Sequence, residues 1–176
     1  MMETERTIWT LLEEKDLPAM TEMSREPDTF RYLRKLRVMT DEEYQQFLLL
    51  KMEQIRLGTG YHWAIWLKRD GSFIGAANLN PVWGNRGSDG DGNGGERPRM
   101  QIGCQLKRDY WGQGFAGELM RGVLDFAIDE LRLPVVYGVF QKENIASRRM
   151  LAKLGFVWLE SKKEHDEEIE IHRYPA

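Results

Sequence analysis

The sequence predicts a mixed α/β fold in a single domain spanning residues 1–176, and three observations support this prediction. The chain has 176 residues, of which 41% are hydrophobic, and this is enough apolar material for one core. Segments with the period of an amphipathic helix alternate with segments that have the two-residue period of a strand. Glycine and proline separate these segments at the points where turns are expected.

The first predicted elements are a strand and two helices. Residues 7–12 are expected to form a short strand, and Asp16 precedes a helix that carries Pro18 in its first turn. Thr40 to Glu43 has the pattern of a capping box, so a second helix is expected to begin there and to end near Gly58. The apolar stripe of this second helix consists of Tyr44, Phe47, Leu48, Met52 and Ile55.

A hairpin and a long glycine-rich loop are predicted next. Residues 62–68 and 72–79 have the pattern of strands, and the Asp-Gly pair between them is a strong hairpin signal. Residues 84–97 hold six glycines and are predicted to form a polar surface loop. Part of this loop matches the start of a calcium-binding loop, but Met100 stands where that motif requires Glu. A flexible, solvated loop is therefore expected.

A strand and a long helix are expected after this loop. Residues 100–106 alternate apolar and polar side chains, as a strand does. The glycines of residues 112–117 then open an amphipathic helix, and Pro134 blocks its continuation. The apolar stripe of this helix consists of Phe115, Leu119, Val123, Ala127 and Leu131, widened by Met120, Leu124 and Ile128.

The chain is predicted to close with a buried strand, a short helix and a hairpin. Residues 135–140 form the strand, and the helix runs from Asn144 to a stop at Gly155, followed by Phe156. Residues 157–162 and 168–174 are expected to pair as the final hairpin. The inward side chains of the short helix are predicted to be Ala146, Met150 and Leu154. The complete expected order is β-α-α-β-β-β-α-β-α-β-β.

Composition narrows the possible functions. Lys and Arg number 25 against 28 Asp and Glu, so the strongly basic balance of a nucleic-acid-binding protein is absent and no nucleic-acid partner is expected. No apolar run approaches the ~18 residues of a membrane span, and the N-terminus lacks the pattern of a signal peptide. Cys104 is the only cysteine and cannot form an internal disulfide, which fits a cytoplasmic location. The three histidines lack zinc-site spacing, so no metal is expected.

The strand–glycine–helix unit of residues 105–119 carries the most chemical information. The start of a helix exposes amides that have no intrahelical partner, together with a partial positive charge. Glycines let a phosphate approach such a backbone closely, although an ordinary tight turn has the same pattern. Gly112, Gly114 and Gly117 also match the dinucleotide fingerprint. That alternative is disfavoured because the preceding strand alternates and few βα units follow.

Asn144 and Ser147 allow two interpretations. Asn at the N-cap and Ser in the first turn are ordinary features of a helix start. Alternatively, the two side chains project beside the phosphate-binding helix and contact an extended carrier arm. Cys104 lies on the apolar face of its strand and is interpreted as a core residue instead of a nucleophile.

Taken together, two segments resemble the GNAT superfamily of acyl-CoA N-acyltransferases. They are Tyr-Trp-Gly-Gln-Gly-Phe-Ala-Gly-Glu at residues 110–118, and Asn144-x-x-Ser147 followed by Lys-Leu-Gly-Phe at 153–156. The sequences of both segments are similar to those of the RimJ/RimL-like branch, whose members acetylate protein N-termini or related amines. The resemblance implies a central mixed, mostly antiparallel sheet flanked by helices.

The resemblance also implies a set of site residues. Backbone amides of residues 112–117 would hold the pyrophosphate of acetyl-CoA, the co-substrate, while the pantetheine would lie along residues 105–107. Many relatives carry Tyr where this chain has Leu151, so Ser147 becomes the candidate catalytic acid. Trp111 departs from the Gln or Arg that begins the superfamily's phosphate motif. The expected cofactor contacts are Gln105, Leu106, Lys107, Gly112, Gln113, Gly114, Phe115, Ala116, Gly117 and Asn144.

The expected reaction is direct transfer of an acetyl group to a primary amine of a protein N-terminus or a small molecule. An α-amine titrates near ~8, so roughly a tenth of it is neutral at pH 7 and needs little help from a base. Candidate bases are Glu118, Glu160 or a water chain, and a strand amide near Leu106 would meet the oxyanion. A catalytically silent acyl-CoA-binding module is the alternative. No membrane partner is expected, and the protein is expected to be a monomer or a homodimer.

Overall fold

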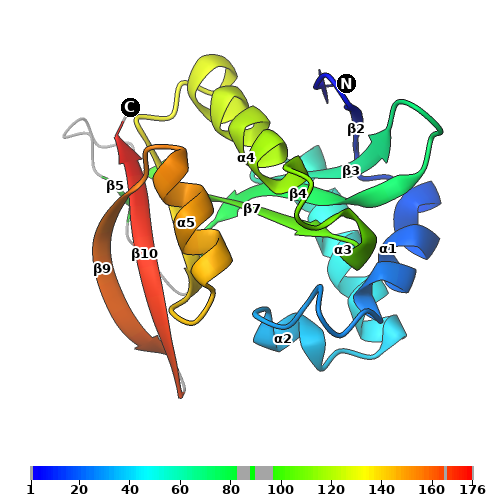
Figure 1. Ribbon diagram of the computed structural model, residues 1–176, viewed down its shortest axis with the longest axis horizontal. Coiled ribbons are helices and arrows are strands. Elements are labelled where there is room, and N and C mark those ends of the chain that lie inside the picture. The colour runs from blue at the N-terminus through cyan, green and yellow to red at the C-terminus, as the bar shows by residue number, and fades with distance from the viewer. Residues whose placement is uncertain (1, 83–87, 90–96, 165, 176) are drawn as a thin grey trace. The chain divides into compact units, whose positions relative to one another are not determined.

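The computed structural model describes residues 2–82, 88–89, 97–164 and 166–175 (Figure 1). These residues form two compact units: residues 1–78 with 103–122, and residues 79–102 with 123–176. In chain order the elements are β1 (Met2–Glu3), β2 (Thr7–Leu11), the 3-10 turn η1 (Glu14–Asp16), α1 (Leu17–Ser24), α2 (Arg34–Arg37), α3 (Asp41–Arg56), β3 (Tyr61–Leu67), β4 (Phe73–Pro81), β5 (Ser88–Asp89), β6 (Arg97–Pro98), β7 (Met100–Leu106), the 3-10 turn η2 (Arg108–Tyr110), α4 (Phe115–Asp125), the π-helical η3 (Phe126–Glu130), β8 (Val135–Gln141), α5 (Ile145–Lys153), β9 (Val157–Glu164) and β10 (Glu167–Pro175).

The main sheet has eight strands in the order β1-β2-β3-β4-β7-β8-β10-β9. Among the strand pairs whose register is described, β7 and β8 are parallel, with Gln101 opposite Tyr137, and the others are antiparallel. The predicted fold class is therefore confirmed: the sheet is mixed, mostly antiparallel, and accompanied by helices. The parallel sheet required by the dinucleotide alternative is not what these strands form.

In the first unit, α3 begins at the predicted capping box. The Thr40 hydroxyl accepts from the Glu43 amide at 3.2 Å, and the Glu43 carboxylate accepts from the Thr40 amide at 2.8 Å. Its apolar stripe joins a core that also takes side chains from α1, and α3 lies beside α1 and β3 in Figure 1. The buried members of this core are Leu12, Met20, Met23, Phe30, Tyr44, Leu48 and Ala76.

The predicted long helix after the glycines is not α-helical throughout. It is α-helical as α4 and then continues as the π-helical η3, where the Leu131 amide donates to the Phe126 carbonyl at 3.2 Å. The spacing of the apolar residues does not distinguish this wider turn from an α-helical one, so the sequence did not predict it. The apolar stripe predicted for this helix is buried, apart from Ile128 and Leu131, which are half-buried.

In the second unit, α5 has the predicted boundaries. Its C-terminus shows the expected Schellman bonds: the Phe156 amide donates to the Leu151 carbonyl at 3.0 Å, and the Gly155 amide donates to the Ala152 carbonyl at 3.1 Å. One detail of the prediction is wrong, because Ala146 is exposed and Leu151 is the buried residue of this helix. A spacing of three or four residues fits more than one face of so short a helix.

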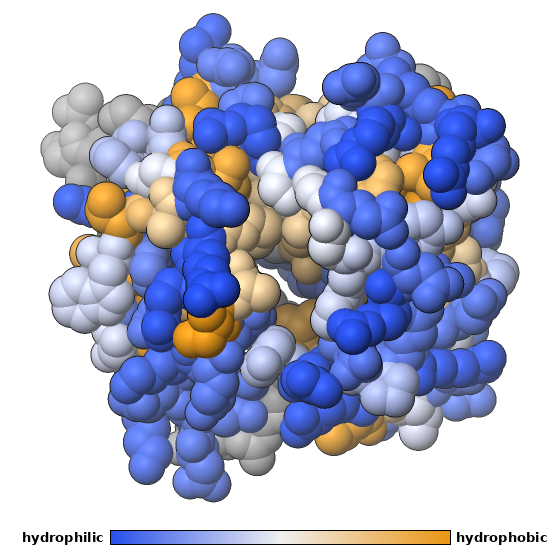
Figure 2. Space-filling view, viewed as in Figure 1, coloured by the Kyte–Doolittle hydropathy of each residue, from blue (hydrophilic) through white to orange (hydrophobic). Residues whose placement is uncertain are grey.

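The final hairpin pairs in the order β8-β10-β9, with a bulge at Ile171 and His172 (Figure 1). Of the predicted glycine-rich loop, the structure describes Ser88, Asp89 and Arg97, and Ser88 and Asp89 pair with Pro98 and Arg97 as a short antiparallel ladder. The rest of that loop, including most of the calcium-like motif, lies outside the described residues. Among the described helices, none has both the length and the apolar character needed to cross a membrane. The face shown in Figure 2 is mostly hydrophilic.

Candidate functional site

The glycine-rich connection between β7 and α4 is held by its own side chains. The Trp111 indole donates to the Leu106 carbonyl at 2.8 Å, and the Gln113 carboxamide donates to the Asp109 carbonyl at 2.7 Å. Gly112 and Gly114 have φ of 72° and 83°, in the left-handed region that favours glycine. The two glycines therefore allow a tight turn that delivers the chain directly into the helix.

The backbone amides of this connection are unpaired, and two of its glycines border open space. The Glu118 amide, one residue beyond the connection, donates to the Gly114 carbonyl at 3.2 Å. The amides of residues 112–117 have no hydrogen-bond partner among the described residues. A Cβ atom placed on Gly112 or Gly117 would meet no other atom within 4 Å. Free donors, open space and a helix N-terminus together fit a phosphate-bearing ligand.

The end of β7 and the residue that follows it supply three of the predicted cofactor contacts to the same unit. The Leu106 carbonyl is occupied, because it accepts from Trp111 and also from the Thr29 hydroxyl at 3.2 Å. The Lys107 amide donates to the Ile74 carbonyl at 2.9 Å, and the Lys107 ammonium pairs with Glu22 at 3.3 Å. Residues 105–107 and the glycine-rich connection thus form one continuous, well-anchored segment.

Arg6 and Glu118 form an ion pair that sequence analysis missed. The Arg6 guanidinium donates to one Glu118 oxygen at 2.8 and 2.6 Å, and the Thr4 hydroxyl bonds the other oxygen. Burial by itself would raise the pKa of Glu118, but the hydrogen bonds from Thr4 and Arg6 and the charge of Arg6 outweigh it and lower this pKa. A carboxylate with a lowered pKa and both oxygens engaged is poorly suited to be the general base.

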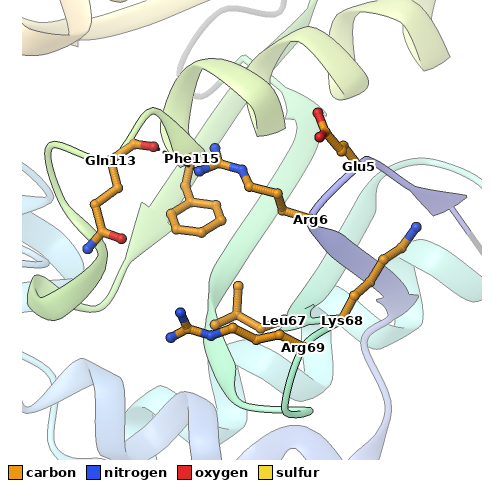
Figure 3. Close-up of a pocket in the computed structure, with 7 residues that line it drawn as sticks. All are labelled: Glu5, Arg6, Leu67, Lys68, Arg69, Gln113 and Phe115. Carbon is orange, nitrogen blue, oxygen red and sulfur yellow. Dashed lines mark hydrogen bonds between the residues drawn. The ribbon is translucent and has the colours of Figure 1, made fainter.

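A cavity of about 430 Å³ borders this ion pair. Figure 3 shows the Phe115 ring and the Arg6 guanidinium on one side of it, with Leu67 and Arg69 on the other. The guanidinium carbon of Arg6 lies 3.9 Å from the centre of the Phe115 ring, a cation–π contact. Phe115, a predicted cofactor residue, therefore turns its ring toward Arg6 and the cavity.

In the second unit, Asn144 is the N-cap of α5. Its side-chain oxygen accepts from the Ser147 amide at 3.1 Å, which is the ordinary role of a capping Asn. The Asn144 side-chain amide and the Ser147 hydroxyl have no hydrogen-bond partner among the described residues. Both groups therefore remain available to a ligand, and the two interpretations of this motif are compatible.

The position that many relatives fill with Tyr has a packing role here. Leu151 is 2% exposed and covers Gly138 of β8, where a Cβ would lie 2.5 Å from the Leu151 Cδ1 atom. One turn earlier, Arg148 binds both oxygens of the buried Glu170 at 3.0 and 2.6 Å and donates to the Lys142 carbonyl. The apolar contact and the ion pair together attach α5 to β8 and β10.

Cys104 lies in β7, and its environment disfavours ionisation. Burial raises the pKa of this thiol to about 12, so little nucleophilic thiolate exists at neutral pH. This shift disfavours a nucleophilic role, as interpreted, but Cys104 is half-buried and does not belong to the buried core. Within the described residues, no three metal-binding side chains lie close enough to hold an ion.

A family model described as an acetyltransferase (GNAT) domain matches residues 6–157, which is most of the chain. The chain belongs to the GNAT superfamily. This GNAT protein is 24% identical over 154 residues to the uncharacterized N-acetyltransferase p20 of Bacillus licheniformis, a match that covers 87% of this chain and 80% of that protein. The resemblance carried by the two motifs is thereby confirmed at the level of the superfamily.

Solved structures of other GNAT proteins have the same fold. RimL, a ribosomal L7/L12 alpha-N-protein acetyltransferase in complex with coenzyme A, superposes with a TM-score of 0.79 at 12% identity, covering 98% of this chain and 95% of that one. A spermidine N-acetyltransferase from Vibrio cholerae, in complex with CoA and spermine, gives a TM-score of 0.75 at 15% identity, with 98% and 96% covered. Acetyl transfer from acetyl-CoA to an amine is thus the general activity that this family supports.

Proposed function

We propose that this GNAT protein is an N-acetyltransferase of the RimJ/RimL-like type that moves an acetyl group from acetyl-CoA directly to a primary amine. The acceptor class is a protein N-terminal amine or a small-molecule amine. Residues 1–176 would act as one catalytic domain in this proposal. Among the related structures, one acts on the N-terminus of a ribosomal protein and another is a spermidine acetyltransferase, which supports both acceptor classes.

The observation that carries the proposal is the set of unpaired amides in residues 112–117. In a GNAT chain, these donors at the start of α4 fit the pyrophosphate of CoA, and Gly112 and Gly117 leave space for it. Gly114 has the backbone angle that the turn requires. The residues present therefore fit the co-substrate, with Gln105 to Lys107 proposed to bind the pantetheine and Asn144 its amide.

Residues of this chain are proposed to stabilise the oxyanion and to donate a proton to the leaving group. When bound, acetyl-CoA supplies the activated acetyl thioester. The amide of a strand residue near Leu106 stabilises the negative charge that develops on the carbonyl oxygen. The Ser147 hydroxyl donates a proton to the departing thiolate, and its lack of a partner among the described residues supports this role.

Deprotonation of the acceptor requires little from the protein if the acceptor is an α-amine. Such an amine has a pKa near ~8, so roughly a tenth is neutral at pH 7. Glu118 is unsuited as a base because Arg6 and Thr4 engage it, which leaves Glu160 or a water chain. Direct transfer is supported by Cys104, whose raised pKa disfavours an acyl-cysteine intermediate.

A catalytically silent acyl-CoA-binding module is the second candidate. It is favoured by Leu151, which is buried against Gly138 and places no hydroxyl where many relatives have Tyr. The polar face of β7, which carries Gln101, Gly103 and Gln105, also lacks a carboxylate. The two candidates share the CoA site and differ only in turnover.

The binding site is tested by calorimetric and thermal-shift measurements with acetyl-CoA. A saturating ligand at ~100 times its Kd should stabilise the wild type by about 2.7 kcal/mol. Gly114→Glu should abolish this stabilisation by clash and by repulsion of the phosphates. Gly58→Glu is the matched control, since Gly58 has a similar φ of 65° with open space around it. Unchanged affinity in Gly114→Glu would refute the site.

Turnover is tested by release of free CoA thiol in the presence of an amine panel that includes N-terminal peptides, polyamines and other small amines. Thiol release that depends on an acceptor supports the enzyme. Binding of acetyl-CoA without turnover on any acceptor would favour the silent module. An acetylated protein isolated in the absence of acceptor would contradict direct transfer.

A further inference from the structure

Arg6 contacts three residues in the glycine-rich connection and the first turn of α4. It lies between β1 and β2, far in sequence from the loop that it touches. Its Nη1 atom donates to the Gln113 carbonyl at 2.9 Å, and its Nε and Nη2 atoms bind Glu118. Its guanidinium carbon lies 3.9 Å from the centre of the Phe115 ring (Figure 3). One guanidinium therefore contacts Gln113 before the helix, Phe115 at the first position of α4 and Glu118 at its fourth position.

The bond to Gln113 determines where the next amide points. A trans peptide unit directs its C=O and N–H in opposite directions. Because the Gln113 carbonyl points to Arg6, the amide N–H of Gly114 points away from Arg6. Side-chain bonds of Trp111 and Gln113 hold the turn as a whole, but among the described residues the orientation of the peptide unit between Gln113 and Gly114 depends on a bond to the Gln113 carbonyl. Arg6 supplies that bond.

The ion pair satisfies much of the charge of the Arg6 guanidinium within the protein. The Glu118 carboxylate, whose side chain is 20% exposed, neutralises the guanidinium, and Thr4 occupies the second carboxylate oxygen. An arginine used in this way orders the backbone through its planar array of donors. Lysine has no such fork and cannot make the same three contacts together.

We infer that Arg6 is a positioning residue, which orients the amides of residues 112–117 toward the pyrophosphate of the acyl donor. This inference rests on the proposed function, because it assumes that these amides bind that pyrophosphate. Arg6 should matter only for donors that carry the pyrophosphate. A donor that ends at the pantetheine does not reach these amides and should be indifferent to Arg6.

The test compares acetyl-CoA with S-acetylpantetheine in the wild type, Arg6→Ala and Arg6→Lys. Both variants should reduce kcat/KM for acetyl-CoA by about ten- to a hundredfold, mainly through KM, since hydrogen bonds to charged groups are lost. With S-acetylpantetheine, kcat/KM should stay within about twofold of the wild type. The Kd of CoA, measured by calorimetry, should rise with the KM of acetyl-CoA.

Arg56→Ala is the matched control, because Arg56 is an exposed arginine that pairs with Glu53 on α3 and is not among the residues that line the cavity. It should leave both donors unaffected. An equal loss with both donors, or no loss with acetyl-CoA, would overturn the inference while the CoA site of the wild type stands. Arg6→Lys keeps the charge and provides the test if Arg6→Ala does not fold. A wild type that fails to bind CoA would refute the proposed function and the inference with it.

Discussion

Leu151 packs directly onto Gly138 and leaves no room there for a larger side chain. A Cβ on Gly138 would lie 2.5 Å from the Cδ1 atom of Leu151 and 3.0 Å from its Cδ2 atom. Gly138→Ala should therefore destabilise the protein by about 1–3 kcal/mol through overpacking. Leu151→Ala should cost about 2–5 kcal/mol by opening a cavity.

The double variant distinguishes this contact from two independent effects. Gly138→Ala with Leu151→Ala should be less unstable than the sum of the single variants, because the new methyl group enters the space that Leu151 leaves. Urea denaturation of all four proteins measures the coupling. Additive losses would contradict the direct contact.

Gly117→Ala should have opposite effects on stability and on CoA affinity. A Cβ at Gly117 meets no protein atom within 4 Å, and alanine favours the helix by up to about 1 kcal/mol. The same methyl group narrows the space proposed for the pyrophosphate, so CoA should bind more weakly. Gly122→Ala on the same helix is the contrast: its Cβ would lie 2.7 Å from Trp9, so it should lose stability. Unchanged CoA affinity in Gly117→Ala would argue against the assigned contact.

Variants of Asn144 separate its capping role from its proposed ligand role. Asn144→Ser keeps a good N-cap oxygen for the Ser147 amide but removes the side-chain amide donor. We expect nearly unchanged thermal stability and weaker CoA binding. Asn144→Ala should lose about 1 kcal/mol of stability as well. If Asn144→Ser binds CoA like the wild type, Asn144 is only a helix cap.

The Arg6–Glu118 pair should make stability depend on pH in the acidic range. The pKa of Glu118 is lowered in the folded protein, whereas an unfolded Glu titrates near ~4.3. The ionised form is therefore favoured by folding, and this contribution is fully present above ~4.3 and disappears as the pH falls through the lower folded pKa. Glu118→Gln should be less stable than wild type at pH 7, and the difference should shrink toward pH ~3.

Chemical denaturation at a series of pH values measures this difference. Glu130→Gln is the control, because Glu130 is exposed and has no hydrogen-bond partner among the described residues. The pH dependence of Glu118→Gln is compared with that of this control. A constant difference for Glu118→Gln would show that the pair does not favour the ionised carboxylate.

Cys104 should react slowly with alkylating reagents in the folded protein. With its pKa raised to about 12, the thiolate is scarce, and iodoacetamide should label it roughly a thousandfold more slowly than a free cysteine at pH 8. Labelling followed by mass spectrometry, with and without denaturant, gives the comparison. Rapid labelling of the folded protein would restore Cys104 as a candidate nucleophile.

Local sequence signals predicted most of the fold. The capping box at Thr40 and Glu43, the Asp-Gly hairpin and the Schellman end of α5 each depend on residues within a few positions of one another. The glycine-rich connection was likewise predicted, because backbone angles such as that of Gly114 are nearly reserved for glycine. The π-helical turn of η3 was missed, since its hydrogen bonding leaves no distinctive side-chain pattern.

By itself, the sequence predicted most helices and strands, though not β1, α2, β5, β6 or η3, together with the position of the amides proposed to bind phosphate and the superfamily that the chain resembles. Only the tertiary structure decided that Arg6 binds Gln113 and Glu118, that Glu118 is therefore a poor base, and that Leu151 is buried on Gly138. The physical reason is the distance along the chain between the residues that interact. Caps and turns are bonds between near neighbours, whereas more than a hundred residues of chain separate Arg6 from Glu118, and only the folded backbone brings them together.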